Sequence, residues 1–339
     1  MEQTDPTLEE WRRLYAAAAA FKQEAPWEWM EEDELFGVRD PETGEIGYMS
    51  IMGILGEHLA LDIFLGAEGL DGFWYMHLGK TQDNPAFLLE VPQLQVSFED
   101  RETLHARDRE VIKALGLKFR GQQAWPMFRD YTPGRAPWFI TSQQARFLTV
   151  ALEQVLDVIH RLRDNPELLN PPEKDRYLVR VLTEQGWEDQ WLAPPPLPMR
   201  PPPPIDSRRL ATMRAELPRQ ALVLEADLFA LPSFVRDGDD PRPYVPYALM
   251  VVESKSGLIL GMELMLARPS LAAVEEQSLT KFMDLISRGG SLPRQIAVRN
   301  ERLYNLLMPL AAGLGIQLRQ ARHMPALDQA RGALQRWLQ

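Results

Sequence analysis

The sequence predicts two domains of different class, an α+β domain in the N-terminal half and an α/β domain with a mixed sheet in the C-terminal half. The chain has 339 residues, which is enough for two domains of ordinary size with a core each. A proline-rich stretch interrupts the sequence past its middle. On both sides of it, helical periodicities of three to four residues alternate with the short apolar runs that are typical of strands.

The proline-rich stretch, residues 194–204, is the predicted linker. Eight of its eleven residues are proline, which disfavours both a helix and an inner strand and favours polyproline II. At roughly 3.1 Å per residue, such a segment spans about 30 Å. We therefore predict an α+β domain over 1–193 and an α/β domain over 205–339, joined by this linker.

The N-terminal half contains recognisable helix starts and one hairpin. A helix should begin after Thr7, whose spacing from Glu10 is that of a capping box. Residues 40–44, Asp-Pro-Glu-Thr-Gly, have the residue types of a hairpin turn. Gly53–Leu65 is expected to form a buried helix that Gly66 closes. The other predicted elements are hairpin strands over 35–38 and 46–51, helices over 100–115 and 141–163, and a strand pair over 177–182 and 187–192.

The C-terminal half has the predicted element order β, β, β, α, β, α, β, α. The second and third strands form a hairpin across Ser254–Gly257. Because the later strands alternate with helices, they need parallel crossover connections, and the sheet should be mixed and five-stranded. The predicted strands lie at 221–226, 247–253, 258–266, 295–298 and 316–318, and the predicted helices begin after Ser270, at Asn300 and at Ala326.

This element order, βββαβαβα, is similar to that of the ribonuclease H-like fold, which also underlies integrases, transposases and actin-type ATPases. The resemblance implies carboxylates on the first strand, at the end of the fourth strand and on a helix, which in the nucleases hold two divalent metals about 4 Å apart. The first strand offers Glu225 and Asp227, and the helices offer Glu275, Glu276 and Asp328. The fourth strand instead ends in Arg299, a cation that would repel the metals. We therefore expect a catalytically silent domain, with a metal-dependent nuclease or nucleic-acid processing enzyme as the alternative.

Charge is distributed unevenly along the chain. The net charge is −11, which argues against a nucleic-acid coat protein or a surface membrane binder. Residues 1–100 carry 21 acidic and 5 basic side chains, whereas 201–339 carry 14 and 17. The sequence contains no cysteine, which excludes disulfides, thiolate nucleophiles and cysteine-bound zinc or iron–sulfur clusters. With no long apolar run and no apolar leader, we expect a cytoplasmic protein that does not bind membranes.

Residues 117–138 interleave basic and aromatic side chains, and their glycines and prolines favour irregular backbone. Arginine binds carboxylate or phosphate, and exposed aromatic rings stack on bases. The candidate binding residues are Arg120, Trp125, Arg129 and Trp138. Their partner would be a protein or a single-stranded nucleic acid. The alternative is that these arginines neutralise the acidic first hundred residues while the aromatic rings fill a small core.

Signatures of common enzyme classes are absent from the sequence, which contains no P-loop, GxGxxG, HExxH or GxSxG motif. His58 and Asp62 are four residues apart and can share a face, but two ligands without a third do not define a metal site. We therefore predict neither a catalytic residue nor a metal, and no cofactor.

Four strings carry a further resemblance. They are Ala25-Pro26-Trp27-Glu28-Trp29, residues 40–48, Ser97-Phe98-Glu99-Asp100-Arg101, and the stretch from Phe119-Arg120-Gly121 to Pro137-Trp138. The chain resembles a family of uncharacterised bacterial proteins in which two domains of unknown function are adjacent. The resemblance implies a bacterial, two-domain protein and supplies no activity. We expect a non-enzymatic binding or accessory protein.

Overall fold

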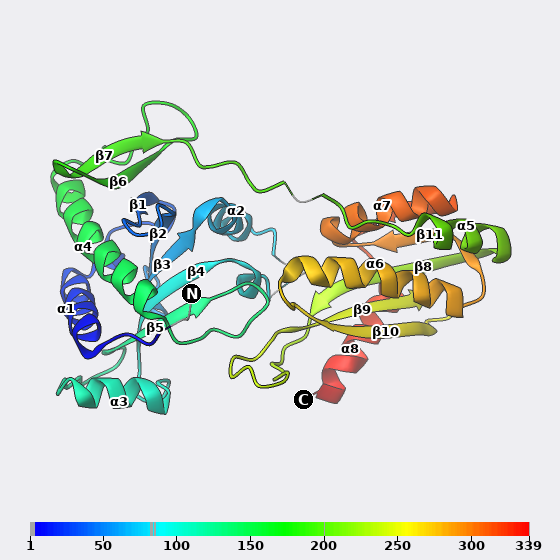
Figure 1. Cartoon of the computed structure of the whole chain (residues 1–339), viewed down its shortest axis with the longest axis horizontal. Coiled ribbons are helices and arrows are strands. Elements are labelled where there is room, and N and C mark those ends of the chain that lie inside the picture. The colour runs from blue at the N-terminus through cyan, green and yellow to red at the C-terminus, as the bar shows by residue number, and fades with distance from the viewer. Residues whose placement is uncertain (1–3, 82–83, 85, 200, 339) are drawn as a thin grey trace. The chain divides into compact units, whose positions relative to one another are not determined.

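The computed structural model describes residues 4–81, 84, 86–199 and 201–338 (Figure 1). Its contacts divide the chain into two compact units. The N-terminal unit lies within the ranges 1–80, 88–132 and 137–198. The C-terminal unit lies within 81–87, 133–136 and 199–339, so two short segments of the first half of the sequence belong to it.

The N-terminal unit contains a seven-stranded sheet with the order β5-β4-β3-β2-β1-β6-β7. Neighbouring strands are antiparallel except for β1 and β6, which are parallel. The strands are β1 (Phe36–Arg39), β2 (Ile46–Met52), β3 (Leu59–Leu65), β4 (Gln93–Glu99), β5 (Trp125–Tyr131), β6 (Tyr177–Thr183) and β7 (Gly186–Leu192). The α+β class that the sequence predicts for this half is confirmed.

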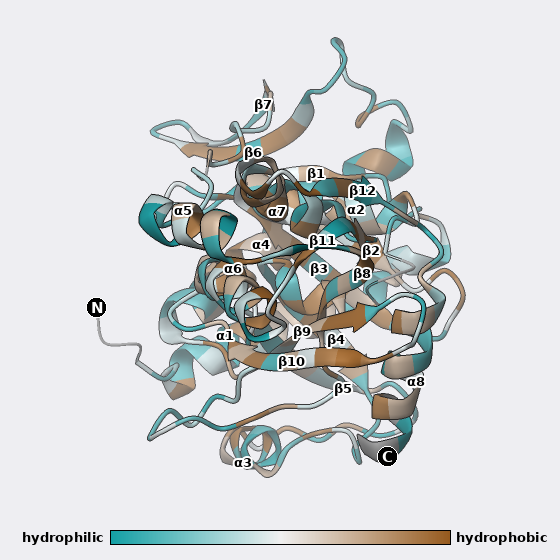
Figure 2. Ribbon diagram, turned by 90° about the vertical axis from the view of Figure 1, so that its right-hand side faces the viewer, coloured by the Kyte–Doolittle hydropathy of each residue, from teal (hydrophilic) through white to brown (hydrophobic). Residues whose placement is uncertain are grey.

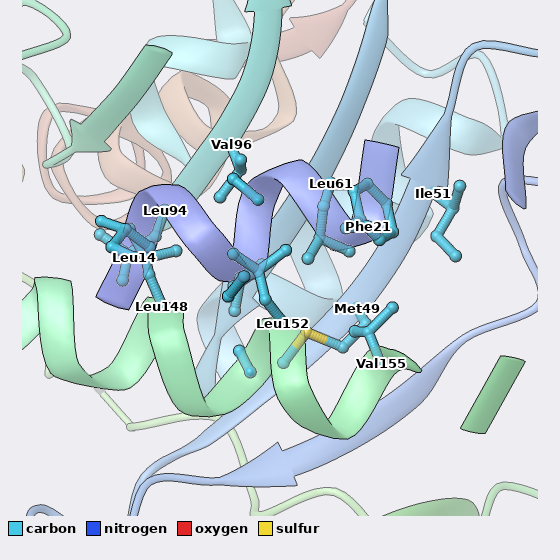
Figure 3. Close-up of a cluster of buried hydrophobic side chains, with 14 of the residues drawn as sticks. Leu14, Phe21, Met49, Ile51, Leu61, Leu94, Val96, Leu148, Leu152 and Val155 are labelled. Atoms are coloured by element: carbon cyan, nitrogen blue, oxygen red, sulfur yellow. The ribbon is translucent and has the colours of Figure 1, made fainter. Parts of the chain in front are cut away.

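Two long helices, α1 (Leu8–Glu24) and α4 (Ser142–Asp164), cover one face of this sheet. Both begin with the predicted capping boxes, in which Thr7 pairs with Glu10 and Thr141 pairs with Gln144. Figure 3 shows how their apolar side chains meet those of the inner strands. The labelled core residues are Leu14, Phe21, Met49, Ile51, Leu61, Leu94, Val96, Leu148, Leu152 and Val155. A shorter helix, α3 (Ala106–Ala114), packs beside α1.

The prediction of a helix over Gly53–Leu65 is wrong, because Leu59–Leu65 forms strand β3. A mostly apolar run of this length fits a buried strand as well as a helix, and β3 is buried on both faces. Gly66 does not close a helix but begins α2 (Gly66–His77), where its φ of +61° requires glycine. Phe73 of α2 packs on Phe64, so α2 covers the face of the sheet opposite α1 and α4.

The other departures in this unit are strands β4 and β5, which the sequence did not predict. The expectation of irregular backbone over 117–138 is wrong for β5, because Trp125–Tyr131 pairs in register with β4. Pro126 is tolerated there because β5 is an edge strand in the sheet order. Two short 3₁₀ helices, η1 (Pro26–Glu28) and η2 (Phe87–Glu90), complete the elements of the first half.

The C-terminal unit contains a five-stranded mixed sheet with the order β10-β9-β8-β11-β12, as predicted. Strands β8, β9 and β10 are antiparallel neighbours, whereas β11 is parallel to both β8 and β12. The strands are β8 (Arg219–Ala230), β9 (Pro246–Glu253), β10 (Ile259–Leu266), β11 (Leu292–Val298) and β12 (Gln317–Gln320). The α/β class predicted for this half is confirmed.

Helices cover both faces of this second sheet. Helix α6 (Leu271–Arg288) packs on β9 and β10, and α7 (Glu301–Leu314) packs on β11 and β12. A helix that the sequence did not predict, α5 (Ser207–Glu216), packs on α7. On the other face, α8 (Pro325–Leu338) contacts β8 and β9, where Leu327 packs among Phe229, Met250 and Val252. Alternate side chains of β8 therefore face α8, and the others face α6 and α7.

Candidate functional site

The predicted binding residues of the 117–138 segment are placed differently from one another. Arg129 is buried, and its guanidinium donates to both carboxylate oxygens of Asp108 in α3, at 3.0 and 2.6 Å. Trp125 is half-buried with its ring 5.6 Å from that of Phe119. Trp138 is half-buried, and its backbone pairs with that of Asp130. Arg120 is exposed. Of the two arginines, Arg120 presents an exposed charge and Arg129 does not, so the four residues do not form one charged surface.

The carboxylates of the first strand of the C-terminal unit are both buried and both face α8. The Asp227 carboxylate accepts from the Arg331 guanidinium at 2.6 Å, and that guanidinium stacks on the Phe229 ring at 4.1 Å. Glu225 accepts a bond from the Ser254 hydroxyl at 2.7 Å and one from the Leu327 backbone N–H at 2.9 Å. Because Leu327 lies in the first turn of α8, the partial positive charge of that helix end also faces Glu225.

Of the three remaining candidate carboxylates, Asp328 and Glu275 are also held by partners within the chain. Arg299, at the end of β11, donates to Asp328 of α8 at 2.7 Å. Glu275 of α6 accepts from Arg302 of α7 at 2.5 Å, and Glu276 is exposed on α6. Helix α6 packs on the face of the sheet opposite α8. Glu275 and Glu276 therefore do not converge with Asp227.

A row of polar side chains crosses the middle of the N-terminal sheet, on the face opposite α1 and α4. It consists of Ser50, Asp62, Gln95 and Arg129, which are register neighbours on β2, β3, β4 and β5. We call these four residues the polar row. All four are buried. Asp62 accepts from the Gln95 amide at 2.8 Å, and Ser50 donates to the Glu32 carbonyl at 2.8 Å.

Burial raises the pKa of Asp62 to about 6, against the lowering effect of the Gln95 hydrogen bond and of nearby His58. The Glu32 carboxylate adds to the increase. His58 is exposed, and its Nε2 lies 3.4 Å from the Gln95 amide nitrogen. His58 directly precedes β3 and Asp62 lies on β3, so the two residues share a face of a strand and not of a helix. An acid with this pKa exchanges its proton near neutral pH. In the described ranges, no group of three or more His, Asp or Glu side chains could hold a metal ion.

Two further polar side chains flank the polar row on the same face of β4. Gln93 and Ser97 are fully buried, and within the described part of the chain neither the Gln93 amide nor the Ser97 hydroxyl makes a hydrogen bond. The sequence contained a signal for this face, because Gln93, Gln95 and Ser97 alternate with apolar residues, as in a strand with one polar face. The partners of Asp227 and Glu225 on α8 had no such local signal.

Two protein-family models match the chain. Residues 11–180 match the model of the family described as Domain of unknown function (DUF7309). The chain belongs to this family. In this DUF7309 member, residues 209–335 also match the model described as Domain of unknown function (DUF6930). Two adjacent domains of unknown function were the expectation from the sequence, and that expectation is confirmed.

The DUF7309 match contains the whole polar row, and the DUF6930 match contains Glu225, Asp227 and Arg331. No curated protein matches the chain. Among the residues that the structure describes, no helix is both long enough and apolar enough to cross a membrane. Neither family description names an activity.

Proposed function

We propose that this protein acts by binding a partner, and that its C-terminal domain is a ribonuclease H-like domain whose carboxylate positions now serve a structural role. One observation carries the proposal: the buried carboxylates of β8 are engaged by groups of the same chain. Asp227 is paired with Arg331, and Glu225 accepts from Ser254 and from the first turn of α8.

The strand order supports the ribonuclease H-like part of this proposal. The first three strands of the C-terminal unit, β8, β9 and β10, form an antiparallel meander in which β8 is the innermost strand of the sheet. Strands β11 and β12 extend the sheet on the other side of β8, and both run parallel to it. Strands β8 and β11, which would supply the metal-binding carboxylates in a nuclease, are neighbours, with Ala226 opposite Val298. The fold thus supports the resemblance, whereas the side chains at the corresponding positions argue against its chemistry.

Electrostatics explains why these positions do not favour a two-metal site. A metal pair needs several carboxylates that converge with their charges unneutralised. Here guanidinium groups of Arg331 and Arg299 lie beside Asp227 and Asp328, so a divalent cation would have to displace two ion pairs. Glu275, the helix carboxylate of the alternative nuclease, lies on the other face of the sheet and is paired with Arg302.

The test is an activity and metal-response assay on the full chain. We expect no cleavage of labelled single- or double-stranded DNA or RNA in the presence of Mn²⁺, and no increase in the unfolding temperature when Mn²⁺ is added. The matched variants are Asp227→Asn and Glu276→Gln, since the first changes a buried pair and the second an exposed carboxylate. Metal-dependent cleavage that Asp227→Asn abolishes and Glu276→Gln retains would establish the nuclease instead.

We propose a protein partner in preference to a single-stranded nucleic acid. The chain carries a net charge of −11, and Arg129, one of the two arginines among the four predicted binding residues, is buried against Asp108. Arg120 is exposed, and Trp125 and Trp138 are both half-buried. Fluorescence titration with single-stranded oligonucleotides at low and high salt tests this choice. A salt-sensitive quench that Arg120→Ala removes would favour the nucleic acid.

The domain organisation and cellular setting belong to the same proposal. Residues 193–199 and 201–206 form neither helix nor strand, which supports a linker role for 194–204 between domains over 1–193 and 205–339. We also propose that the protein is bacterial and cytoplasmic, as the family resemblance and the sequence composition imply. Limited proteolysis of the full chain tests the boundaries. Cleavage near the linker should leave two protected fragments.

A further inference from the structure

A four-residue segment between β5 and α4, Pro133–Ala136, belongs to the C-terminal unit although both neighbouring elements belong to the N-terminal one. We call it the inserted segment. Its Ala136 N–H donates to the Pro243 carbonyl, and its Gly134 carbonyl accepts from the Val245 N–H, both at 2.9 Å. These two hydrogen bonds are those of antiparallel strands, so the inserted segment pairs as a short strand with the chain that leads into β9.

The chain that receives the inserted segment is itself fixed within the C-terminal unit. On the side away from the inserted segment, Tyr244 exchanges two backbone hydrogen bonds with Val235, at 2.8 and 2.9 Å. The residues that follow form β9, which is hydrophobic (Figure 2) and almost entirely buried. The inserted segment therefore adds to a formed edge, which is the geometry by which many domains bind an extended peptide.

Arg135 of the inserted segment is held by three groups of the C-terminal unit. Its guanidinium donates to the Asp240 carboxylate at 2.6 Å and to the Arg242 carbonyl at 2.9 Å, and it lies 4.0 Å from the centre of the Tyr244 ring. Asp240 is oriented for this contact, because it also accepts from the Arg242 N–H at 2.9 Å and from the Tyr244 hydroxyl at 3.4 Å. A planar cation can donate to two oxygen atoms and stack on a ring at once, so the site favours arginine over lysine.

The residues on either side of Arg135 are small and buried. Gly134 has a φ of +77°, and a Cβ added to it would lie 2.3 Å from the Cβ of Ala267. Both the backbone conformation and the close approach therefore require glycine. Ala136 is 6% exposed, and its carbonyl accepts from the Arg242 side chain at 2.8 Å. The site thus combines a backbone edge, a closed position for glycine, a pocket for arginine and a buried position for alanine.

We propose that the C-terminal unit contains a binding site for an extended Gly-Arg-Ala peptide, and that the inserted segment is the ligand that fills it in this chain. The groups that form the site all come from residues 235–267, past the proline-rich stretch, whereas the inserted segment precedes that stretch. Arg135 and Asp240 are 105 positions apart in the sequence. Their contact does not require a nearby covalent connection, so a free peptide of the same sequence should bind there and compete with the inserted segment. This inference depends neither on the loss of nuclease chemistry nor on the identity of a partner.

The first experiment tests whether the inserted segment occupies the site in solution. In the full chain, hydrogen–deuterium exchange is measured in the peptic peptides that contain Ala136 and Val245, whose N–H groups form the two backbone hydrogen bonds. Arg135→Ala should accelerate this exchange by about tenfold or more, because the inserted segment loses its charged contact. Arg107→Ala is the matched control, since Arg107 also donates to a carboxylate at 2.6 Å and lies 4.5 Å from the centre of the Phe139 ring, but within the N-terminal unit. Exchange that Arg135→Ala leaves unchanged, or that Arg107→Ala accelerates equally, would overturn the occupancy of the site.

The second experiment tests the binding of a free peptide. The full chain with both Gly134→Ala and Arg135→Ala has an emptied site, because the added Cβ clashes and the cation is absent. The probe is a fluorescently labelled synthetic peptide of residues 131–138 with blocked ends, and its binding is followed by anisotropy. It should bind the emptied chain at least about tenfold more tightly than the wild type, in which the inserted segment competes at an effective concentration of about 1 mM. The same peptide carrying Arg135→Lys should bind at least about tenfold more weakly.

Variants of the emptied chain locate the peptide. Asp240→Ala should weaken its binding by at least about tenfold, because this change removes the carboxylate that Arg135 contacts. Asp237→Ala is the matched control, because Asp237 lies in the same connection between β8 and β9 but pairs with Arg268. The single variant Arg135→Ala is measured in parallel and replaces the emptied chain if circular dichroism shows that the double variant does not fold. Absence of binding, or equal binding to the emptied chain and the wild type, would overturn the proposal. Equal weakening by Asp240→Ala and Asp237→Ala would overturn the location of the site.

Discussion

Two buried carboxyl groups, one in each unit, have partners of different charge. Asp62 on β3 and Asp227 on β8 both lie on inner strands, and each is 3% exposed. Asp227 faces the Arg331 guanidinium at 2.6 Å. Asp62 accepts instead from the neutral amide of Gln95, at 2.8 Å. The two residues are equally buried, but of the two only Asp227 forms an ion pair within the described part of the chain.

Because of this difference, the stability of the Asp62 site should depend on pH, and that of the Asp227 site on its ion-pair partner. Burial without a cation raises the pKa of Asp62 to about 6, so its protonation changes within the physiological range. The stability of the Asp227 site depends instead on its partner, because a carboxylate deprived of its cation in a buried position is strongly unfavourable. The N-terminal unit should therefore be sensitive to pH at this site, and the C-terminal unit to the identity of residue 331.

Replacing the cation is expected to have the largest effect. Arg331→Met removes the guanidinium that is paired with the buried Asp227 carboxylate and should lower the free energy of unfolding of the C-terminal unit by about 3 to 5 kcal/mol. Urea unfolding followed by circular dichroism measures this change. The double variant Asp227→Leu, Arg331→Met removes both charges and should recover most of the loss. If the double variant is as unstable as the single one, the ion pair is not the cause.

Removing the titrating acid should have the next largest effect, with a defined pH dependence. An aspartate has an ordinary pKa of 3.8, whereas Asp62 has about 6 in the folded chain. Between these values the folded chain retains a proton that the unfolded chain has released, so the stability of the wild type falls as the pH rises from about 4 to about 6. Above that window the penalty is constant, and below it the penalty is absent.

The variant Asp62→Asn cannot titrate and should therefore gain stability relative to the wild type as the pH rises. The difference should be near zero at pH 4 and at most about 3 kcal/mol above pH 6.5, since one pKa unit corresponds to about 1.4 kcal/mol. The interactions of the Asp62 charge with Glu32, His58 and Gln95 are part of the raised pKa, and the variant removes them together with the charge.

Tryptophan fluorescence is the suitable signal for this measurement, because eight of the nine tryptophans lie between residues 11 and 191. It reports on the N-terminal unit in the full chain. A difference in the free energy of unfolding that is the same at pH 4 and pH 7 would contradict a pKa raised by burial.

Local signals in the sequence were sufficient for most of the fold. The capping boxes at Thr7 and Thr141 located the starts of α1 and α4, and the apolar periodicity after Ser270 located α6. In the C-terminal half the alternation of strands and helices also implied the mixed sheet, because crossover connections impose parallel strands. The β3 segment was misread because a strand buried on both faces has no alternation to distinguish it from a buried helix.

The candidate sites depend on contacts that no local pattern encodes. Asp227 and Arg331 are 104 residues apart, and the polar row takes one residue from each of four strands. Arg129 was predicted to bind a ligand on the strength of its basic and aromatic neighbours in the sequence. Its carboxylate partner, Asp108, lies 21 positions away on α3 and became apparent only in three dimensions.

The smallest expected effects come from two glutamines on the same face of β4, and they should have opposite signs. Gln95 donates to Asp62, so Gln95→Met removes a hydrogen bond to a buried acid, raises the pKa of Asp62 further and should lower stability by about 1 kcal/mol. Gln93 is equally enclosed, but in the described structure its amide has no hydrogen-bond partner. Gln93→Met therefore removes an unsatisfied polar group and should be neutral or stabilising by about 1 kcal/mol.

The pair of glutamine variants separates the effect of hydrogen bonding from the effect of burial, since both replace a glutamine by a side chain of similar size on one strand. Tryptophan-detected urea unfolding at pH 7 measures both. Equal losses of stability in the two variants would mean that the Gln93 amide makes a hydrogen bond in solution that is as stabilising as the one between Gln95 and Asp62. Gln93 would then not be an unsatisfied polar group.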